Sequence, residues 1–274
     1  MPACTVVIAF YNKPDYLALV LAGFQRQTRR DFEILIADDG SREAVVRRVH
    51  ALMADSGLNV RHLWQEDRGF RKNRILNEAI RQAASDYLIF VDGDCVPHRA
   101  FVEAHLYHRA PDRVLTGRRV NLSARLTARL TPEQVRAGIL ERPFGRVFRD
   151  ALWGGTRRWE QGVYLPPGAL RRWVNRKPRG LIGCNMSMWR RDLEAVNGFD
   201  ERYQAPGFGE DSDIDHRLRL AGKTVLGLSN AAVQYHLHHR ELPRAEANRD
   251  LFESVKAAGV VRTPYGLVRE APAD

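Results

Sequence analysis

The stretch Tyr87-Leu88-Ile89-Phe90-Val91-Asp92-Gly93-Asp94 joins a strand pattern to two carboxylates. Its five consecutive apolar or aromatic residues are typical of a strand that is buried on both faces. Open α/β sheets place their ligands at the carboxyl ends of such strands, which is where Asp92 and Asp94 lie. Gly93 allows a tight turn, so both carboxylates could approach one phosphate-bound cation from the same side. The same residues also fit an ordinary Asp-Gly turn, and this stretch alone does not decide between the two.

Apolar strands alternate with amphipathic helices on both sides of this stretch. We expect strands at residues 5–10, 32–37, 59–64, 87–92, 180–189, 224–228 and 231–237. We expect helices at residues 15–27, after an N-cap at Ser41, and at 71–84, 211–221 and from 242 onward. This alternation predicts an α/β fold with a mostly parallel, Rossmann-like, doubly wound sheet flanked by helices, with right-handed crossovers.

The bulk composition fits a single large domain with a hydrophobic core. The chain has 274 residues, of which 44% are hydrophobic, and no apolar run approaches the roughly 18–20 residues of a membrane-spanning helix. The start of the sequence lacks the basic region of a signal peptide. The three cysteines, Cys4, Cys95 and Cys184, form no Cys-x-x-Cys pair. We therefore expect reduced, buried thiols and a cytoplasmic protein.

Positive charge is concentrated in residues 118–180. This segment holds 15 Lys and Arg but only 4 Asp and Glu, so the rest of the chain is nearly neutral although the net charge is +10. Turns such as Pro-Phe-Gly, Trp-Gly-Gly and Pro-Pro-Gly interrupt the arginines, which predicts either an irregular insertion or short amphipathic pieces. One basic segment indicates one face with an anionic partner.

The turn after the first strand argues against a dinucleotide-binding fold. Phe10-Tyr11-Asn12-Lys13-Pro14 contains no glycine, whereas that fold needs a glycine-rich turn to let the backbone reach the pyrophosphate. Without such a turn, a nucleotide diphosphate would have to be bound in another way. A cation held by Asp92 and Asp94 could bind it, together with basic side chains. Asp38 or Asp39 could accept hydrogen bonds from a ribose or a base.

Two further segments could complete such a site. Tyr11 offers an aromatic surface for stacking. The helix that Gly69-Phe70-Arg71-Lys72-Asn73-Arg74 opens could direct positive charge and its N-terminal dipole at a phosphate.

The sequence resembles the family 2 glycosyltransferases, which have the GT-A fold. The matching motifs are Val6-Val7-Ile8-Ala9-Phe10-Tyr11-Asn12, Ile36-Ala37-Asp38-Asp39-Gly40-Ser41, Asp92-Gly93-Asp94, Gly183-Cys184-Asn185-Met186-Ser187 with Asn197-Gly198-Phe199-Asp200, and Gly209-Glu210-Asp211-Ser212-Asp213. The Gly-Phe-Arg-Lys segment and the histidines after the acidic motif are most similar to the galactosyltransferase and chondroitin-polymerase-like branch. The resemblance covers residues 5–117 and 180–240 and covers the basic insertion only weakly.

The resemblance implies a role for each motif. Nucleotide-sugar contacts, with a UDP-sugar favoured, would come from Phe10, Tyr11, Asn12, Asp38, Asp39, Arg71, Arg74, Asp92, Gly93 and Asn185. Asp94 would be the principal metal carboxylate, with Asp92 assisting it. Asp211 would be the catalytic base of an inverting transfer, and Glu210 would contact acceptor or donor hydroxyls.

The sequence Tyr235-His236-Leu237-His238-His239 offers imidazoles for the same metal. On a strand, His236 and His238 point to one face and His239 points to the other. Carboxylate and imidazole ligands with phosphate oxygens suit Mn²⁺, and Mg²⁺ could substitute. His236 fits the metal histidine of the family better than His238, which stays a second candidate. A partly exposed cluster without any ligand is the alternative.

An inverting transfer needs a carboxylate that removes a proton from the acceptor hydroxyl. Asp211 lies at the start of a helix after Gly207-Phe208-Gly209, although an acidic helix start is also favoured by the helix dipole alone. The alternative function is a nucleotide-sugar or carbohydrate-binding module without catalysis, which would not need Asp211.

These expectations divide one GT-A domain into four parts. They are a nucleotide-binding half (1–117), the basic insertion (118–180), an acceptor and catalytic half (181–240) and a C-terminal helix and tail (241–274). We hypothesise that the insertion covers the acceptor cleft and faces an anionic glycolipid, such as a lipopolysaccharide core, at the inner face of the cell membrane. Its arginines could instead hold the diphosphate and a phosphorylated soluble acceptor. No motif indicates nucleic-acid binding.

Overall fold

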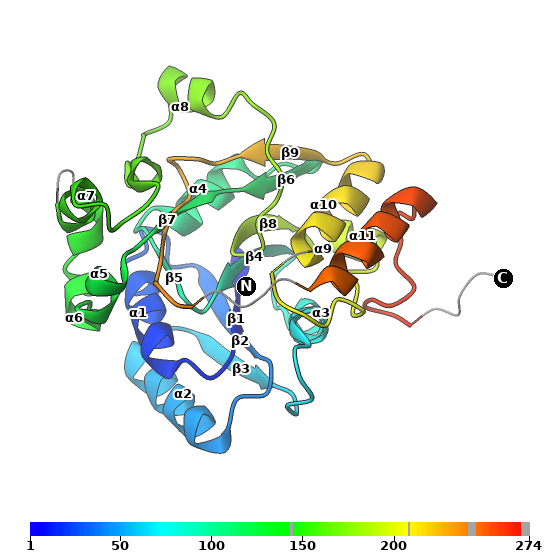
Figure 1. Ribbon diagram of the computed structural model, residues 1–274, viewed down its shortest axis with the longest axis horizontal. Helices are drawn as coiled ribbons and strands as arrows, with labels where there is room; N and C mark the ends of the chain where they lie inside the picture. The colour runs from blue at the N-terminus through cyan, green and yellow to red at the C-terminus, as the bar shows by residue number, and fades with distance from the viewer. Residues whose placement is uncertain (143–144, 208, 241–244, 270–274) are drawn as a thin grey trace.

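A seven-stranded mixed sheet forms the centre of the computed structural model, which describes all residues except 143–144, 208, 241–244 and 270–274 (Figure 1). The strand order is β3-β2-β1-β4-β8-β6-β9. The strands are β1 (Cys4–Phe10), β2 (Phe32–Asp38), β3 (Val60–Trp64), β4 (Tyr87–Asp92), β6 (Arg113–Thr116), β8 (Asn185–Trp189) and β9 (Thr224–Gly227). Only β8 runs antiparallel to its neighbours, so the predicted mostly parallel sheet is confirmed. Residues 1–117 and 181–240 both contribute strands to it.

Side-chain alternation along the strands creates a core on each face of this sheet. Val6 and Ile8 of β1 belong to one hydrophobic cluster, and Val7 belongs to the other. The first cluster packs against α1 (Pro14–Phe24), α2 (Glu43–Ser56) and α4 (Phe101–His108). The second packs against α3 (Lys72–Gln82), α9 (Arg190–Ala195) and α10 (Glu210–Leu220). Because both faces are covered, the central strands read as continuous apolar runs rather than as alternating ones.

A smaller sheet lies beside the carboxyl end of β4. It has the order β5-β10-β7 and consists of β5 (Cys95–Pro97), β7 (Arg118–Asn121) and β10 (Val233–His236). The turn at Gly93 and Asp94 joins β4 directly to β5. The register places His236 opposite Cys95, so the end of a late strand comes beside the Asp92-Gly93-Asp94 turn.

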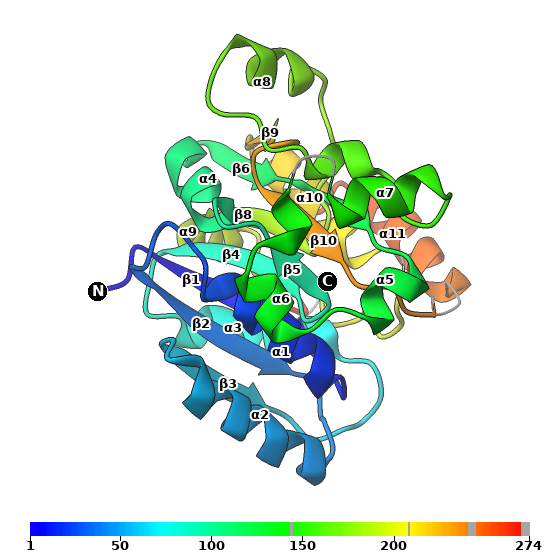
Figure 2. The same ribbon diagram turned by 90° about the vertical axis from the view of Figure 1, so that its left-hand side faces the viewer.

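After β7, the basic segment (residues 118–180) forms a series of short helices. Of the two alternatives expected from the sequence, this agrees with short pieces rather than with an irregular insertion. These are α5 (Ala124–Ala128), α6 (Pro132–Arg136), α7 (Arg146–Leu152), α8 (Ala169–Val174) and the 3₁₀ turns Ile139–Glu141 and Trp159–Gly162. An ion pair between Arg26 and Glu141 ties this segment to α1. Helix α8 stands away from the rest of the fold in both views (Figure 2).

The helix start after β2 differs from the prediction. Helix α2 begins at Glu43 with Arg42 as its N-cap, and Ser41 does not cap it. The Ser41 hydroxyl instead accepts a hydrogen bond from the backbone N–H of Asn12 at 2.8 Å. It therefore joins the turn after β1 to the turn after β2. The last helix, α11 (Glu246–Ala258), packs against α10. Within the described part of the chain, no helix has both the length and the apolar character that crossing a bilayer requires.

A buried ion pair fixes α10 in place. The fully buried Arg217 guanidinium donates to Asp213 at 2.5 and 2.8 Å. It also donates to the carbonyl oxygens of Val196 and Gly198 at 2.7 and 2.9 Å. These hydrogen bonds of the Arg217 guanidinium connect α10 to the residues that follow α9. They therefore hold in place the helix whose first residues are Glu210 and Asp211.

Replacing Arg217 with Met should lower the free energy of unfolding by about 3–5 kcal/mol, because it leaves the Asp213 carboxylate buried without a cationic partner. Urea denaturation measures this loss. Arg219→Met is the matched control: Arg219 pairs with Asp215 on the exposed side of the same helix, and its loss should cost less than about 1 kcal/mol. Equal costs for the two variants would contradict a special role for the buried pair.

Candidate functional site

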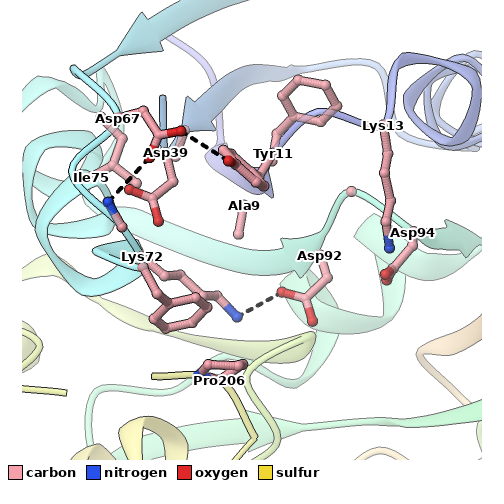
Figure 3. Close-up of a pocket in the computed structure, with 15 residues that line it drawn as sticks. Ala9, Tyr11, Lys13, Asp39, Asp67, Lys72, Ile75, Asp92, Asp94 and Pro206 are labelled. Carbon is pink, nitrogen blue, oxygen red and sulfur yellow. Dashed lines mark hydrogen bonds and ion pairs between the residues drawn. The ribbon is translucent and has the colours of Figure 1, made fainter. Parts of the chain in front are cut away.

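A cavity of about 390 Å³ opens at the carboxyl ends of β1 and β4 (Figure 3). It is lined by Ala9, Phe10, Tyr11, Lys13, Ala37, Asp39, Asp67, Gly69, Phe70, Lys72, Ile75, Asp92, Gly93, Asp94 and Pro206. We call it the central cavity. It lies where an open α/β sheet is expected to bind its ligand.

One end of the central cavity combines an aromatic ring with acidic side chains. Tyr11 is half-exposed, and its hydroxyl donates to Asp67 at 3.0 Å. Asp39 accepts from the Gln65 amide at 2.5 Å and from the backbone N–H of Arg71 at 2.8 Å. Burial raises the pKa of Asp39, although these donors oppose the shift. This end therefore presents a stacking surface and carboxylate acceptors held in fixed positions.

A lysine of the central cavity contacts carboxylates from two elements. The Lys72 ammonium lies 2.9 Å from Asp92 Oδ1 (Figure 3) and 3.9 Å from Glu210 Oε1. Burial alone would lower the pKa of Lys72, but the two carboxylates outweigh burial and raise it. Lys72 therefore stays charged and links the end of β4 to the start of α10.

The backbone of β1 approaches Gly93 closely. A β-carbon on Gly93 would lie 3.0 Å from the Ala9 carbonyl oxygen and 3.3 Å from the Phe10 ring. The Gly93 N–H donates to that same carbonyl at 2.8 Å. The turn is thus held against β1, and its two carboxylates take different partners: Lys72 for Asp92, and histidines for Asp94.

Two imidazoles converge on Asp94. His239 Nε2 lies 3.0 Å from Asp94 Oδ2, and His236 Nε2 lies 3.6 Å from Asp94 Oδ1. The two Nε2 atoms are 3.2 Å apart. Burial lowers the pKa of His236 to about 4, which keeps this imidazole neutral. A carboxylate and two imidazoles that meet at such distances are a suitable donor set for a transition-metal ion.

Cys95 lies in the same cluster but is a poor ligand. Its sulfur is close to Asp94 and His236, and it donates to Asp94 Oδ1 at 3.5 Å. Burial, and then the hydrogen bond to Cys184, raises the pKa of Cys95 well above its usual value. Since metals bind the thiolate, a carboxylate and imidazoles are the better candidates. All three cysteines are buried and unpaired, as predicted.

The structure separates the two predicted metal histidines. His238 is exposed, and the hydrogen bonds at this residue involve its backbone, from Tyr16 to its carbonyl and from its N–H to Thr127. The prediction that His238 shares a face with His236 fails because β10 ends at His236, so strand alternation does not continue. The chain turns there, and His239 comes back beside His236 instead.

Five predicted nucleotide-binding residues do not line the central cavity, namely Asn12, Asp38, Arg71, Arg74 and Asn185. Asn12 has a left-handed backbone (φ 51°) and accepts from the Arg42 N–H. Asp38 is fully buried and bonds His62 at 3.0 Å and the Ser41 N–H at 2.8 Å. Both therefore hold the strand-end turns that surround the cavity.

Asn185, another of these residues, lies between the two sheets. Its amide donates to the carbonyls of Arg118 and Ala232 at 3.2 and 2.9 Å, and its carbonyl faces His105. A β-carbon on Gly117 would lie only 2.3 Å from the Asn185 amide nitrogen. Asn185 thus connects β8 to the strands of the smaller sheet.

Of the basic residues at the start of α3, Lys72 lines the central cavity, whereas Arg71 and Arg74, which were predicted to bind the nucleotide sugar, do not. Lys72 shares the inward face of α3 with Ile75 and Leu76, three and four residues later. Arg74 lies on the opposite, exposed face, and Arg71 precedes the first turn. Helical spacing was therefore the signal in the sequence that could have identified Lys72.

Acidic residues at the start of α10 lie close to Lys72, although neither Glu210 nor Asp211 lines the central cavity. Burial raises the pKa of Glu210, although the positive charge of Lys72 acts in the opposite direction. The Glu210 Oε2 atom has no hydrogen-bond partner among the described residues. Asp211 Oδ2 accepts from the Gly183 N–H at 3.4 Å. A β-carbon on Gly183 would lie 3.8 Å from both Asp211 Cβ and Lys72 Nζ, so these side chains flank one glycine.

Two family models match the chain. "Glycosyl transferase family 2" matches residues 5–146, more than half of the sequence, and "N-terminal domain of galactosyltransferase" matches residues 174–240. The chain is 26% identical to the chondroitin synthase of Escherichia coli over 276 residues, which cover 98% of this chain and 38% of that protein.

The fold is similar to solved structures at low sequence identity. The Staphylococcus aureus TarS structure, residues 1–349 with UDP, aligns with a TM-score of 0.59 and 16% identity over 94% of this chain and 65% of that chain. The mannosyltransferase PcManGT from Pyrobaculum calidifontis, with GDP-Man and Mn²⁺, aligns with a TM-score of 0.57 and 18% identity over 94% of this chain and 70% of that chain. These matches establish the predicted GT-A fold.

Replacing His239 with Asn should weaken Mn²⁺ binding about 10–100-fold, because it removes an imidazole that converges on Asp94. His238→Asn, one position away, should leave binding unchanged within about twofold, since that imidazole is exposed. Isothermal titration with MnCl₂ measures both affinities. A loss of affinity in the His238 variant that exceeds the loss in the His239 variant would contradict this assignment.

Proposed function

Because the chain belongs to glycosyltransferase family 2, we propose that it moves a hexose or N-acetylhexosamine from a nucleotide diphosphate sugar to a saccharide acceptor, with inversion. The branch expected from the sequence motifs agrees with the galactosyltransferase model and the chondroitin synthase relative. We favour UDP as the nucleotide, in line with the UDP that TarS binds in its structure.

The donor would occupy the central cavity, with its nucleoside at the Tyr11 end. The Tyr11 ring offers a stacking face, and Asp39 and Asp67 offer acceptors for ribose or base N–H and O–H groups. The diphosphate would lie toward Lys72, which carries the positive charge on the cavity side of α3. Its ammonium can exchange part of its contact with Asp92 for phosphate oxygens.

The residues beside the diphosphate position fit a divalent cation. Asp94, His236 and His239 supply one carboxylate and two imidazoles whose atoms converge, and Asp92 lies across the turn. We favour Mn²⁺, with Mg²⁺ as a substitute. When bound, the ion would neutralise charge that develops on the leaving diphosphate.

The acceptor would approach from the α10 side. Asp211 is proposed to take the proton from the acceptor hydroxyl, and the Gly183 N–H orients its carboxylate for that task. Glu210 would contact a sugar hydroxyl through its Oε2 atom, which has no hydrogen-bond partner among the described residues. The observation that carries the proposal is the pair of contacts of Lys72 with Asp92 and Glu210, which joins a cavity-lining residue at the end of β4 to the start of α10.

The wider setting is proposed from the charge distribution. The arginine-rich residues 118–180 favour an anionic saccharide or glycolipid acceptor. We propose a role in the synthesis of surface polysaccharide or lipopolysaccharide, at the inner face of the cell membrane. The exposed Trp173 on α8 supports a peripheral contact there.

Asp211→Asn should lower turnover about 10²–10⁴-fold, because the amide cannot accept the proton, while the affinity for UDP with Mn²⁺ stays nearly the same. A UDP-release assay and titration calorimetry measure the two quantities. Asp215→Asn, one turn later on α10, is the control and should keep most of the activity.

Two results would overturn this assignment. If turnover and nucleotide binding disappear together, Asp211 is structural rather than catalytic. If the unmodified protein binds nucleotide sugars but neither hydrolyses nor transfers them, the chain is a binding module.

Lys72→Met should raise the dissociation constant for UDP about tenfold or more, because Asp92 and Glu210 would face the diphosphate without a cation between them. Arg74→Met removes an equal charge from the exposed face of α3 and should change the affinity little. Calorimetry in the presence of Mn²⁺ compares them. A larger effect of the Arg74 change would show that the diphosphate lies elsewhere.

A further inference from the structure

A second large cavity, of about 820 Å³, lies between the short helices of the basic segment. Four arginines line it, namely Arg125, Arg129, Arg146 and Arg149, together with Asp150 and Trp153. We call it the arginine groove. Its lining includes none of the residues that line the central cavity.

The arginine groove has a surplus of positive charge. Asp150 is the single acidic residue among those that line the groove. Its carboxylate accepts hydrogen bonds from the Arg125 guanidinium at 2.9 Å and from the Thr156 hydroxyl at 2.8 Å. Arg146 donates to a neutral amide, that of Gln134. In the described ranges, Arg129 and Arg149 form no ion pair with an acidic side chain. Such guanidinium groups are well suited to carboxylate or phosphate oxygens.

An exposed aromatic ring lies beside these charges. Trp153 is 83% exposed, an unusual position for the largest apolar side chain. A flat indole ring can pack against the apolar face of a sugar ring, and its N–H can donate to a hydroxyl. The groove is concave, so it fits a chain lying within it better than the broad surface of a bilayer.

The arginine groove is connected to the proposed metal site through α5. The Leu122 N–H donates to the His236 carbonyl at 2.9 Å, and the His238 N–H donates to the Thr127 hydroxyl at 2.9 Å. Arg125 and Arg129 lie on this short helix or at its end. Figure 2 shows α5 and α7 on the side of the molecule where β10 ends. A chain bound in the groove would therefore lie beside the end of β10.

We propose that the arginine groove binds a saccharide chain that carries carboxylate or phosphate groups, as a site separate from the one where transfer occurs. The guanidinium groups bind the anionic groups, and Trp153 packs against a sugar ring. This inference rests on the proposed function for the identity of the chain as an acceptor or product. Binding itself requires neither donor nor turnover.

The test uses three tetrasaccharide probes and the whole protein. Tetragalacturonate and maltotetraose are both α-1,4-linked and differ in charge, and maltotetraose with a terminal phosphate separates phosphate from carboxylate recognition. Titration calorimetry should detect tetragalacturonate or the phosphorylated probe, but not maltotetraose. Affinity should fall as salt is raised.

Two variants localise the binding. Arg129→Gln combined with Arg149→Gln should weaken binding of the charged probe about tenfold or more, and Trp153→Ala should also weaken it. Arg47→Gln combined with Arg249→Gln lowers the net charge equally at exposed positions on α2 and α11 and should change the affinity little.

Other results would overturn the proposal. Equal weakening by the two double variants would show that only net charge matters. Tighter binding of inorganic polyphosphate or of a single-stranded oligonucleotide, unaffected by Trp153→Ala, would show a general polyanion surface. Binding to phosphatidylglycerol vesicles that needs Arg129 and Arg149, without binding of any saccharide probe, would indicate a membrane contact. UDP and Mn²⁺ titrations on the same samples report on the proposed transferase site independently.

Discussion

A side chain at position 93 would crowd the backbone of β1, because a β-carbon there would meet the Ala9 carbonyl oxygen at 3.0 Å. This contact presses the turn after β4 against the end of β1, and the backbone hydrogen bond between the same residues fixes it. Asp92 and Asp94 are therefore directed to different neighbours, one toward Lys72 on α3 and the other toward the histidines after β10. The charged groups around the central cavity are placed by this one close approach.

The sequence predicted the parts of the fold that depend on local pattern. Continuous apolar runs identified β1, β2 and β4, because a strand covered on both faces has no polar side to interrupt the run. The short strand β5 and helix α4 had no such signal, since their form depends on contacts with distant segments. For the same reason, the antiparallel direction of β8 within the sheet could not be predicted from its own residues.

The site residues, too, could be predicted only where their position follows from the local strand or helix pattern. Asp92 and Asp94 line the cavity because they follow a strand directly. His239 was placed on the wrong face because alternation was extended past the end of the strand. Arg74 was chosen over Lys72 although helical spacing separates the two faces. Asp38 and Asn185 belong to recognisable motifs, yet their polar atoms bind other parts of the protein. A motif thus identified the region of the site more reliably than the role of each residue.

The close contact between Gly117 and Asn185 should constrain which residues can occur at these two positions in homologous chains. The Asn185 amide fills the space where a side chain on Gly117 would be, so the two positions cannot change independently. A larger residue at 117 would demand a smaller one at 185, and the hydrogen bonds between the two sheets would be lost with it. Among homologous chains these two positions should covary as a pair. Such covariation would record the packing of two sheets against each other rather than the recognition of a sugar.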